Sequence, residues 1–341
     1  MGRLSVSAMR FRQAIVAAMT DEMKADESVI FFGEDVAAAE GPFKTSEGLL
    51  DTFGPQRVRD TPISEMGFTG AAVGAAMMGM RPIIEIMFME FLGVALDQLV
   101  TEGAKMHYLS NGEYSVPMVV RASCGSGLGF GSQHSQTLEN WVAATPGLKV
   151  VQPSNPQSAY SLLRAAIQDN NPVMFLEPRI LYADRGEVDT SIEMQIGKAQ
   201  LLEVGTDLTI VSLGSMVNVA RSAIKDSGLS VDLIDLATLV PWDREAVVAS
   251  VKKTGRLVVV EESPWSGGWG SEIISYVTTQ LFTELKCVPI RMTTPDVPVP
   301  FNGTLEARFL PTANDVASAI TSMVRTGKAP EPWWVTEGFQ K

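Results

Sequence analysis

The chain has 341 residues, of which 45% are hydrophobic and 19% are charged, and this length exceeds what one hydrophobic core usually organises. Its composition is that of a soluble globular protein, which excludes a disordered tail or linker protein. The formal net charge of -12 repels a phosphate backbone and no Lys/Arg cluster offsets it, so we expect no nucleic-acid partner.

No apolar run reaches the roughly 18 to 20 residues that a membrane span needs, and residues 1–23 predict a capped amphipathic helix rather than a signal peptide. We therefore expect a cytoplasmic protein without a membrane span. Cys124 and Cys287 lie far apart and match no metal-binding spacing, so we expect both to be reduced and without a role.

Strands and helices alternate along the first half of the chain. Strands are expected at residues 28–33, 81–91, 116–122, 148–153 and 172–178. Helices are expected from Glu65 to residue 80 and at residues 94–110, 137–144 and 155–169. This alternation predicts a parallel sheet covered on both faces.

The second half begins the same pattern again. Strands are expected at residues 208–215, 231–239, 256–263 and 288–294, with helices at 217–225, 244–253, after Gly270 and at 314–324. Residues 183–198 are polar and lack a pattern, so the domain junction is placed there. The fold class is therefore α/β with two doubly wound domains, residues 1–190 and a smaller one at 199–330, followed by a tail at 331–341.

Two glycine-rich segments are candidates for nucleotide-binding loops, but neither has the glycine spacing that such loops require. Residues 125–131 (GSGLGFG) and 266–270 (SGGWG) lack the G-x-G-x-x-G spacing, and the chain has no G-x-x-x-x-G-K-[ST] motif. NAD and ATP are therefore poor candidates as cofactors.

The sequence contains only two histidines, so acid and base chemistry by an imidazole must use one of them. Of the two histidines, His107 lies in an expected helix, whereas His134 lies between a glycine-rich loop and a helix start, among polar residues that could orient it. Glu65 follows a Thr-Pro turn at the start of a helix of small residues, where a carboxylate is favoured by the helix dipole or serves as a buried functional acid. Spacing alone leaves both alternatives open for Glu65. For His134 it leaves open a catalytic residue or a solvated loop histidine.

Several long motifs in order resemble one enzyme family. DTPISEMGFTGAAVGAAMMGMRP, GSQHSQ, PGLKVVQPSNP, AIQDNNPV, VVVEESPWSGGWGSEI and TTPDVPVP are similar to the β subunits of the first component of 2-oxo acid dehydrogenases, which act on pyruvate, branched-chain 2-oxo acids or acetoin. The similarity covers about residues 10–325. It implies a pyrimidine-binding domain and a transketolase-type C-terminal domain, with thiamine diphosphate as the cofactor.

The resemblance also implies partners. The family's diphosphate and Mg²⁺ motif begins with Gly-Asp-Gly, and this sequence contains no such tripeptide. An α subunit is therefore expected to bind the diphosphate and Mg²⁺ in an α2β2 heterotetramer, which works with a lipoyl-bearing acyltransferase core.

The motifs carry roles for four residues. Glu65 matches the glutamate that hydrogen-bonds the aminopyrimidine ring, where an acid favours the tautomer that activates the cofactor. Met87 and Phe91 match positions that line the aminopyrimidine pocket, although simple strand packing would also explain them. His134 matches a histidine that faces the substrate or the lipoyl group and stabilises charge or donates a proton.

The AAIQDNNP segment matches a monovalent-cation site of the family. Oxygen ligands suit a hard cation such as K⁺. The resemblance implies five ligand residues: Met118, Ala166, Ile167, Asp169 and Asn171.

The implied reaction is the oxidative decarboxylation of a 2-oxo acid with transfer of the acyl group to lipoamide. Pyruvate is the first candidate substrate and acetoin the second. A thiamine-dependent carboligase or transferase without a lipoyl core, and a non-catalytic scaffold, are the alternatives from other classes.

Overall fold

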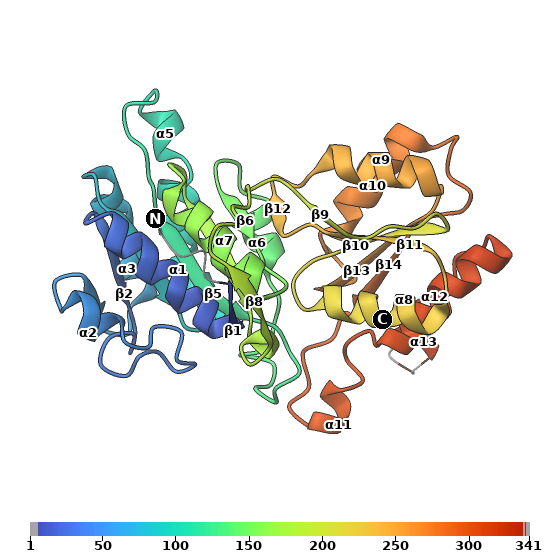
Figure 1. The fold of residues 1–341 in the computed structure, drawn as a ribbon, viewed down its shortest axis with the longest axis horizontal. Helices are drawn as coiled ribbons and strands as arrows, with labels where there is room; N and C mark the ends of the chain where they lie inside the picture. Colours follow the sequence, from blue (N-terminus) through green and yellow to red (C-terminus); the bar gives the residue numbers. More distant parts are fainter. Residues whose placement is uncertain (1–5, 337, 339–341) are drawn as a thin grey trace. The chain divides into compact units, whose positions relative to one another are not determined.

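The computed structural model describes residues 6–336 and 338, which form two compact units (Figure 1). Unit 1 contains the described residues up to 124, together with residues 141–196 and 239–241. Unit 2 contains residues 125–140, 197–238 and the described residues from 242 onward. The chain leaves unit 1 for unit 2 after Ile196, within the expected junction at 183–198, but the segment 125–140, which the sequence placed in the first domain, packs with unit 2.

Unit 1 is built on a seven-stranded sheet with the strand order β12-β6-β7-β5-β4-β2-β3. The pairs β2–β3, β2–β4, β4–β5, β5–β7 and β6–β7 are all parallel. The strands are β2 Val29–Gly33, β3 Val58–Asp60, β4 Arg81–Ile86, β5 Val119–Cys124, β6 Lys149–Val151, β7 Val173–Pro178 and β12 Thr238–Val240. The parallel sheet expected from the alternating pattern is confirmed.

Seven α-helices accompany this sheet along the chain. They are α1 Phe11–Ala25, α2 Leu49–Phe53, α3 Glu65–Met77, α4 Leu92–Leu96, α5 Met106–Leu109, α6 Glu139–Ala143 and α7 Pro156–Gln168. Helix α1 packs along α7, and α3 packs on β4 and against α4. The small side chains of α3 allow this close packing, as its sequence predicts.

The N-terminal segment differs from the expected helix. Residues Val6–Arg10 form strand β1, which pairs antiparallel with β8, Arg185–Asp189, and the helix begins only at Phe11. Gln13 Oε1 accepts a hydrogen bond from Arg10 N at 2.9 Å and so caps that helix start. A pairing across about 180 residues cannot be read from a local window, which is why both strands were missed.

The expected strand 81–91 and helix 94–110 are also shorter than predicted. Strand β4 ends at Ile86, and the carbonyl of the next residue, Met87, accepts a hydrogen bond from the side-chain hydroxyl of Ser123 on β5 in place of a backbone N–H. Phe91 ends the 3₁₀ turn η1, Met89–Phe91. A π-helical turn, η2 Asp97–Gly103, then separates α4 from α5, and Ala104 N bonds to Leu99 O.

Unit 2 is built on a five-stranded sheet with the order β14-β13-β10-β11-β9. Strand β9 is antiparallel to β11, and the other pairs are parallel. The strands are β9 Gln200–Glu203, β10 Leu208–Ser212, β11 Val231–Asp235, β13 Leu257–Pro264 and β14 Ile290–Thr294. The expected strand 231–239 divides into β11 and β12 because Ala237 has φ 54°, a left-handed conformation that ends the strand.

The helices of unit 2 complete its α/β architecture. They are α8 Met216–Ser227, α9 Arg244–Thr254, α10 Gly270–Leu281, α11 Gly303–Glu306, α12 Ala313–Thr326 and α13 Trp333–Thr336. Helix α12 packs on α8, and α10 packs on α9. Trp333 Nε1 donates to Thr293 O at 2.8 Å, so the start of the expected tail 331–341 packs on unit 2, while residues 337 and 339–341 lie outside the described part.

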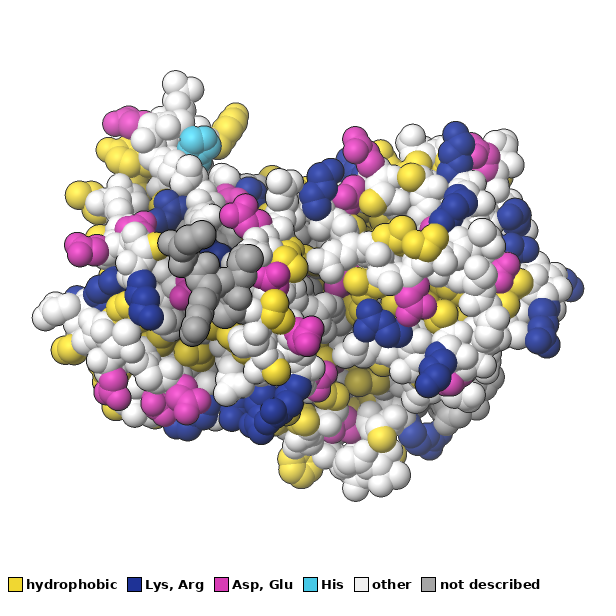
Figure 2. Space-filling model, viewed as in Figure 1, with side chains coloured by type: hydrophobic (Ala, Val, Ile, Leu, Met, Phe, Trp, Pro, Cys, Tyr) yellow, Lys and Arg dark blue, Asp and Glu magenta, His cyan; other side chains and the backbone are white. Residues whose placement is uncertain are grey.

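The surface carries charges of both signs. On the face shown in Figure 2, Lys and Arg side chains are interspersed with Asp and Glu side chains. None of the helices in the described part of the chain has both the length and the apolar character that crossing a bilayer requires.

A buried cluster of charges ties three central strands of unit 1 together. Arg121 on β5 is fully buried and donates to both carboxylate oxygens of Glu177 on β7, at 2.7 and 3.1 Å, and to Glu85 Oε2 on β4 at 2.8 Å. Burial opposes the charged form of Arg121, but the carboxylates of Glu177 and Glu85 raise its pKa. Thr45 Oγ1 and the Tyr182 hydroxyl donate to the two glutamates at 3.0 and 2.7 Å, so the cluster is well supplied with hydrogen bonds.

Replacing Arg121 tests the importance of this cluster. Arg121→Ala leaves two carboxylates in an apolar interior without their cation, so we expect the free energy of unfolding to fall by about 3 to 5 kcal/mol in urea. As a control, Arg221→Ala removes a half-exposed pair with Glu203 at 3.5 Å and should change it by about 1 kcal/mol or less. Equal effects of the two substitutions would contradict the assignment.

Candidate active site

Two carboxylates lie together at the carboxyl edge of the unit 1 sheet. Glu34 follows the last residue of β2, and Glu65 begins α3, five residues after the end of the neighbouring strand β3. The strands are parallel and Gly33 is paired with Asp60, so both chain segments emerge at the same edge. Thr61 N donates to Gly33 O at 2.9 Å and holds the two exits together.

Both side chains are buried, with 9% of Glu34 and 8% of Glu65 exposed. Burial, and next the nearby carboxylate of Glu65, raise the pKa of Glu34. Glu34 Oε1 has no hydrogen-bond partner among the described residues. A buried acceptor without a donor is costly, so this edge suits a ligand group that carries N–H donors.

The expected pocket residues Met87 and Phe91 stand near this edge and not in a strand. Met87 directly follows β4 and is half-buried, and Phe91 precedes α4, which packs against α3. Phe88 meets Phe91 edge to face, with 5.6 Å between the ring centroids. Phe88 and Phe91 thus provide apolar, aromatic surface where the chain passes from β4 to α4, the helix that packs against α3.

His134 belongs to unit 2, in the loop 125–140. It is half-buried, and its amide donates to Gly131 O at 3.2 Å. Next to it a cavity of about 160 Å³ is lined by Ser135, Leu138, Glu262, Val299 and Phe309, among others. The Ser135 hydroxyl is buried and has no partner within the described residues, and the cavity lining also includes the polar residues Gln136, Thr137 and Thr294.

Glu139 lies near the C-terminal end of the same loop, and its side chain is buried. Its Oε1 accepts hydrogen bonds from Ser263 Oγ at 2.7 Å and from Trp269 Nε1 at 3.1 Å, while its Oε2 has no partner in the part of the chain that the structure describes. Burial raises the pKa of Glu139 to about 7. The neutral acid is therefore the form that the folded protein prefers below that pH.

The other histidine and the cysteines lie elsewhere. His107 lies in α5, is exposed, and its Nδ1 is 3.0 Å from Tyr114 O, which fits a surface role. Cys124 and Cys287 form no disulfide, and Cys124 accepts a hydrogen bond from Gln152 Nε2 at 3.5 Å.

Of the residues expected to bind a monovalent cation, Met118 directly precedes β5, and the others lie at the C-terminal end of α7: Ala166, Ile167, Asp169 and Asn171. Asp169 ends this helix as its cap, and its Oδ1 accepts hydrogen bonds from Asn171 N and Nδ2 at 2.9 and 3.0 Å. The carbonyls of Met118, Ala166 and Ile167 each accept one hydrogen bond, the last from Arg81 Nε at 2.8 Å. A carbonyl oxygen has a second lone pair, so a cation ligand remains chemically compatible with these bonds.

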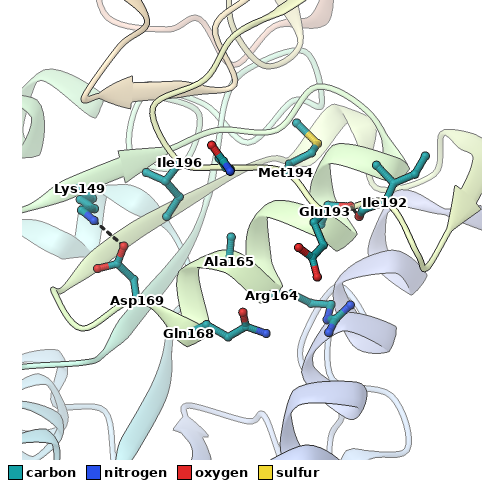
Figure 3. Close-up of a pocket in the computed structure, with 11 residues that line it drawn as sticks. Lys149, Arg164, Ala165, Gln168, Asp169, Ile192, Glu193, Met194 and Ile196 are labelled. Atoms are coloured by element: carbon teal, nitrogen blue, oxygen red, sulfur yellow. Dashed lines mark hydrogen bonds and ion pairs between the residues drawn. The ribbon is translucent and has the colours of Figure 1, made fainter.

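Basic side chains of the protein lie next to these expected ligand residues. Lys149 Nζ forms an ion pair with Asp169 Oδ2, and the two line a surface cavity of about 350 Å³ together with Arg164, Gln168 and residues 192–196 (Figure 3). Although burial opposes it, Lys149 and Asn171 lower the pKa of Asp169. The described residues contain no group of three or more His, Cys, Asp and Glu side chains that could hold a metal.

Family comparisons agree with this architecture. Residues 7–185 match the transketolase pyrimidine-binding domain and residues 197–316 match the transketolase C-terminal domain, which defines a two-domain protein of the transketolase class. A solved structure described as a split-gene transketolase, an inactive β4 tetramer, has the same fold with a TM-score of 0.77 at 22% identity, covering 93% of this chain and 100% of that one.

Relatives with higher sequence identity identify the family within the transketolase class. The chain is 42% identical over 319 residues to the rice (Oryza sativa subsp. japonica) protein named pyruvate dehydrogenase E1 component subunit beta-2, mitochondrial, covering 91% of this chain and 85% of the relative. It is 43% identical over 325 residues to the Caenorhabditis elegans β subunit (93% and 92% covered) and 42% identical over 323 residues to that of Rhizobium meliloti (93% and 70%). The chain belongs to the family of pyruvate dehydrogenase E1 component β subunits.

Sequence reasoning singled out Glu65 but not the residues that support the site. Nothing in the local sequence pattern around Glu34 shows that its carboxylate lies near that of Glu65. Glu262 and Glu306, which bind the His134 loop, lie 136 and up to 179 residues from the groups they contact. No local signal announces such contacts.

The raised pKa of Glu139 has a measurable consequence. An unfolded Glu titrates near 4.5, so between pH 4.5 and about 7 the unfolded state loses a proton that the folded state keeps. The free energy of unfolding should therefore fall as pH rises through this window, by up to about 1.4 kcal/mol per pH unit. In urea unfolding, Glu139→Gln should flatten this pH dependence, whereas the exposed control Glu284→Gln should not. An unchanged slope in Glu139→Gln would refute the assignment of this pH dependence to Glu139.

Proposed function

We propose that the chain acts as the β subunit of a pyruvate dehydrogenase-type enzyme, which decarboxylates a 2-oxo acid oxidatively with thiamine diphosphate and transfers the acyl group to lipoamide. The observation that carries this proposal is the buried carboxylate of Glu65 at the start of α3, on the carboxyl edge of the sheet and beside Glu34. Membership of the β-subunit family supports the same reaction.

The residues at this edge fit an aminopyrimidine. Glu65 would accept a hydrogen bond from the protonated ring nitrogen, and the unpartnered Glu34 Oε1 adds a second acceptor at the same edge. Met87 and Phe91 would exclude water and so strengthen these bonds. When bound, thiamine diphosphate supplies a nucleophilic carbon and an electron sink for decarboxylation. The contribution of Glu65 to catalysis would be to hold a proton on the ring nitrogen of the bound cofactor.

The active site is shared with an α subunit in this proposal. The sequence contains no Gly-Asp-Gly motif, so the diphosphate and Mg²⁺ are assigned to the α subunit of an α2β2 heterotetramer. The names of the relatives, as subunits β of a multi-component enzyme, support a partner of this kind. A lipoyl-bearing acyltransferase core completes the assembly and receives the acyl group.

His134 is proposed to act on the later half of the reaction. A half-buried imidazole in a loop can donate a proton to the incoming lipoyl group or stabilise charge that develops on its sulfur. A screen of pyruvate, branched-chain 2-oxo acids and acetoin with the co-purified α and β subunits identifies the substrate.

We also propose a cytoplasmic location. Two cysteines without a disulfide suit a reducing compartment. Cell fractionation followed by immunodetection tests the location.

Glu65→Gln tests the function. The amide cannot hold the proton on the ring, so turnover of the reconstituted complex should fall by about 100-fold or more, while thermal unfolding changes little. The matched control Glu47→Gln, at an exposed position of unit 1, should keep full turnover. Near-normal activity of Glu65→Gln, or absence of any 2-oxo acid activity in the wild-type complex, would reject the proposal.

The K⁺ site is proposed at Met118, Ala166, Ile167, Asp169 and Asn171 and has its own test. If K⁺ binds the folded chain alone, stability should be greater in KCl than in choline chloride, by roughly 3 kcal/mol at a hundred-fold excess over Kd. Asp169→Ala should abolish this difference between salts. Equal melting temperatures of the wild type in the two salts would exclude the site.

A further inference from the structure

The glycine-rich loop before His134 has the backbone of an anion site. Gly125, Gly127, Gly129 and Gly131 all have positive φ, at 95°, 95°, 74° and 74°. Residues with side chains alternate with them, and alternation of this kind turns successive backbone N–H groups toward a common point, where an anion binds. The loop therefore resembles a phosphate cradle in its backbone, although its sequence lacks the phosphate-binding spacings.

An anion of the protein itself fills this site. Gly127 N donates to Glu306 Oε1 and Gly129 N donates to Glu306 Oε2, both at 2.8 Å. The Glu306 side chain is buried, with 3% exposed, and it ends α11, whose start is capped by the Asn302 side chain. One carboxylate thus binds two main-chain donors that stand two residues apart.

A second carboxylate holds the entrance of the loop. Glu262 Oε1 accepts from Ser126 N at 2.6 Å and from Ser126 Oγ at 2.9 Å, and Thr137 Oγ1 donates to the Glu262 carbonyl at 3.1 Å. Gly125 N donates to Gln136 O at 3.1 Å and closes the base. Residues on both sides of His134 are therefore tied to unit 2, while the intervening Ser132 and Gln133 are exposed.

The side of the loop that leads to His134 also depends on close packing. A side chain at Gly131 would meet the ring of Phe301 at 3.2 Å, so the loop lies directly against the segment that precedes α11. Gly131 O in turn accepts the amide of His134 at 3.2 Å. The position of the imidazole is thus determined through a short chain of contacts that runs from Glu306 by way of Gly127, Gly129 and Gly131.

We propose that Glu306 is a positioning residue for His134, acting as an internal anion that occupies the glycine loop and fixes its shape. The glycines serve this carboxylate, and the loop takes no external phosphate. Since the readout uses acyl transfer, the kinetic part of this inference rests on the proposed function.

A carboxylate suits this place better than an amide. Both of its oxygens accept, so each faces an N–H, and the charge strengthens both bonds. In Glu306→Gln one amide N–H would face a backbone N–H, leaving a buried donor unsatisfied. Glu306→Ala leaves the two backbone donors without an acceptor and opens a space where a small carboxylate fits.

Chemical rescue tests this in the αβ holoenzyme. Glu306→Ala should lower the lipoamide-linked kcat by about 10- to 100-fold, the range expected for losing bonds to a buried charged acceptor, with KM for the 2-oxo acid nearly unchanged. Sodium formate should restore much of this rate in Glu306→Ala but not in Glu306→Gln. Formamide, its neutral isostere, and sodium chloride at equal ionic strength should not. Failure of formate to exceed both controls would overturn the inference.

Coupling to His134 separates positioning from a general loss of stability. The substitution Glu306→Ala should cost little when His134→Ala is already present, because the group that it positions is gone. Formate should leave His134→Ala unchanged. Full multiplication of the two losses would show that Glu306 acts independently of His134.

A spectroscopic readout stands apart from activity. With histidine labelled with ¹³C at Cε1 only, in the β subunit alone, the chain should give two ring signals, and His134→Ala assigns them. Glu306→Ala should shift or broaden the His134 signal, formate should return it, and the His107 signal should stay in place. If the wild-type complex lacks lipoamide activity, the proposed function fails, but this measurement still tests the positioning role of Glu306. An unchanged His134 signal in Glu306→Ala would reject that positioning role.

Discussion

The structure depends on how each buried carboxylate is compensated for the loss of water. An acid taken into a protein interior must meet a cation, accept hydrogen bonds from fixed donors, or keep its proton. Glu85 and Glu177 share the guanidinium of Arg121, and Glu306 accepts two backbone amides. Glu139 takes the third course, with a pKa raised to about 7 by burial. These three solutions stabilise the sheets and the loop on which the candidate chemistry depends.

Glu34 and Glu65 differ from those acids, and the difference supports the proposed site. Neither forms an ion pair within the described residues, and Glu34 Oε1 lacks a hydrogen-bond partner there. Both stand at the carboxyl edge of a parallel sheet, where chain ends converge and ligands of α/β proteins bind. A ligand with N–H donors would satisfy the Glu34 Oε1 acceptor, and this supports the proposal that an aminopyrimidine binds at this edge.

The glycine-rich loop shows how one backbone geometry can serve different ends. Positive-φ glycines create an anion site wherever they alternate with other residues, and the anion decides the function. Here the anion is Glu306, so the loop is a rigid support for His134, and its resemblance to a nucleotide loop is one of backbone geometry alone.

The sequence by itself determined the class and order of the elements, because alternation of apolar runs and turn residues is a local property: the strands β2, β5, β7 and β10 and the helices α3, α7 and α12 stand where their patterns predict. It also singled out Glu65 and His134 through their motifs. Only the tertiary structure decided the pairing of β1 with β8, the end of β4 at Ile86, the meeting of Glu34 with Glu65 and the anchoring of Gly127 by Glu306. Those depend on contacts between residues that are tens to more than a hundred positions apart, and no local pattern encodes which distant donor will meet which acceptor once the chain has packed.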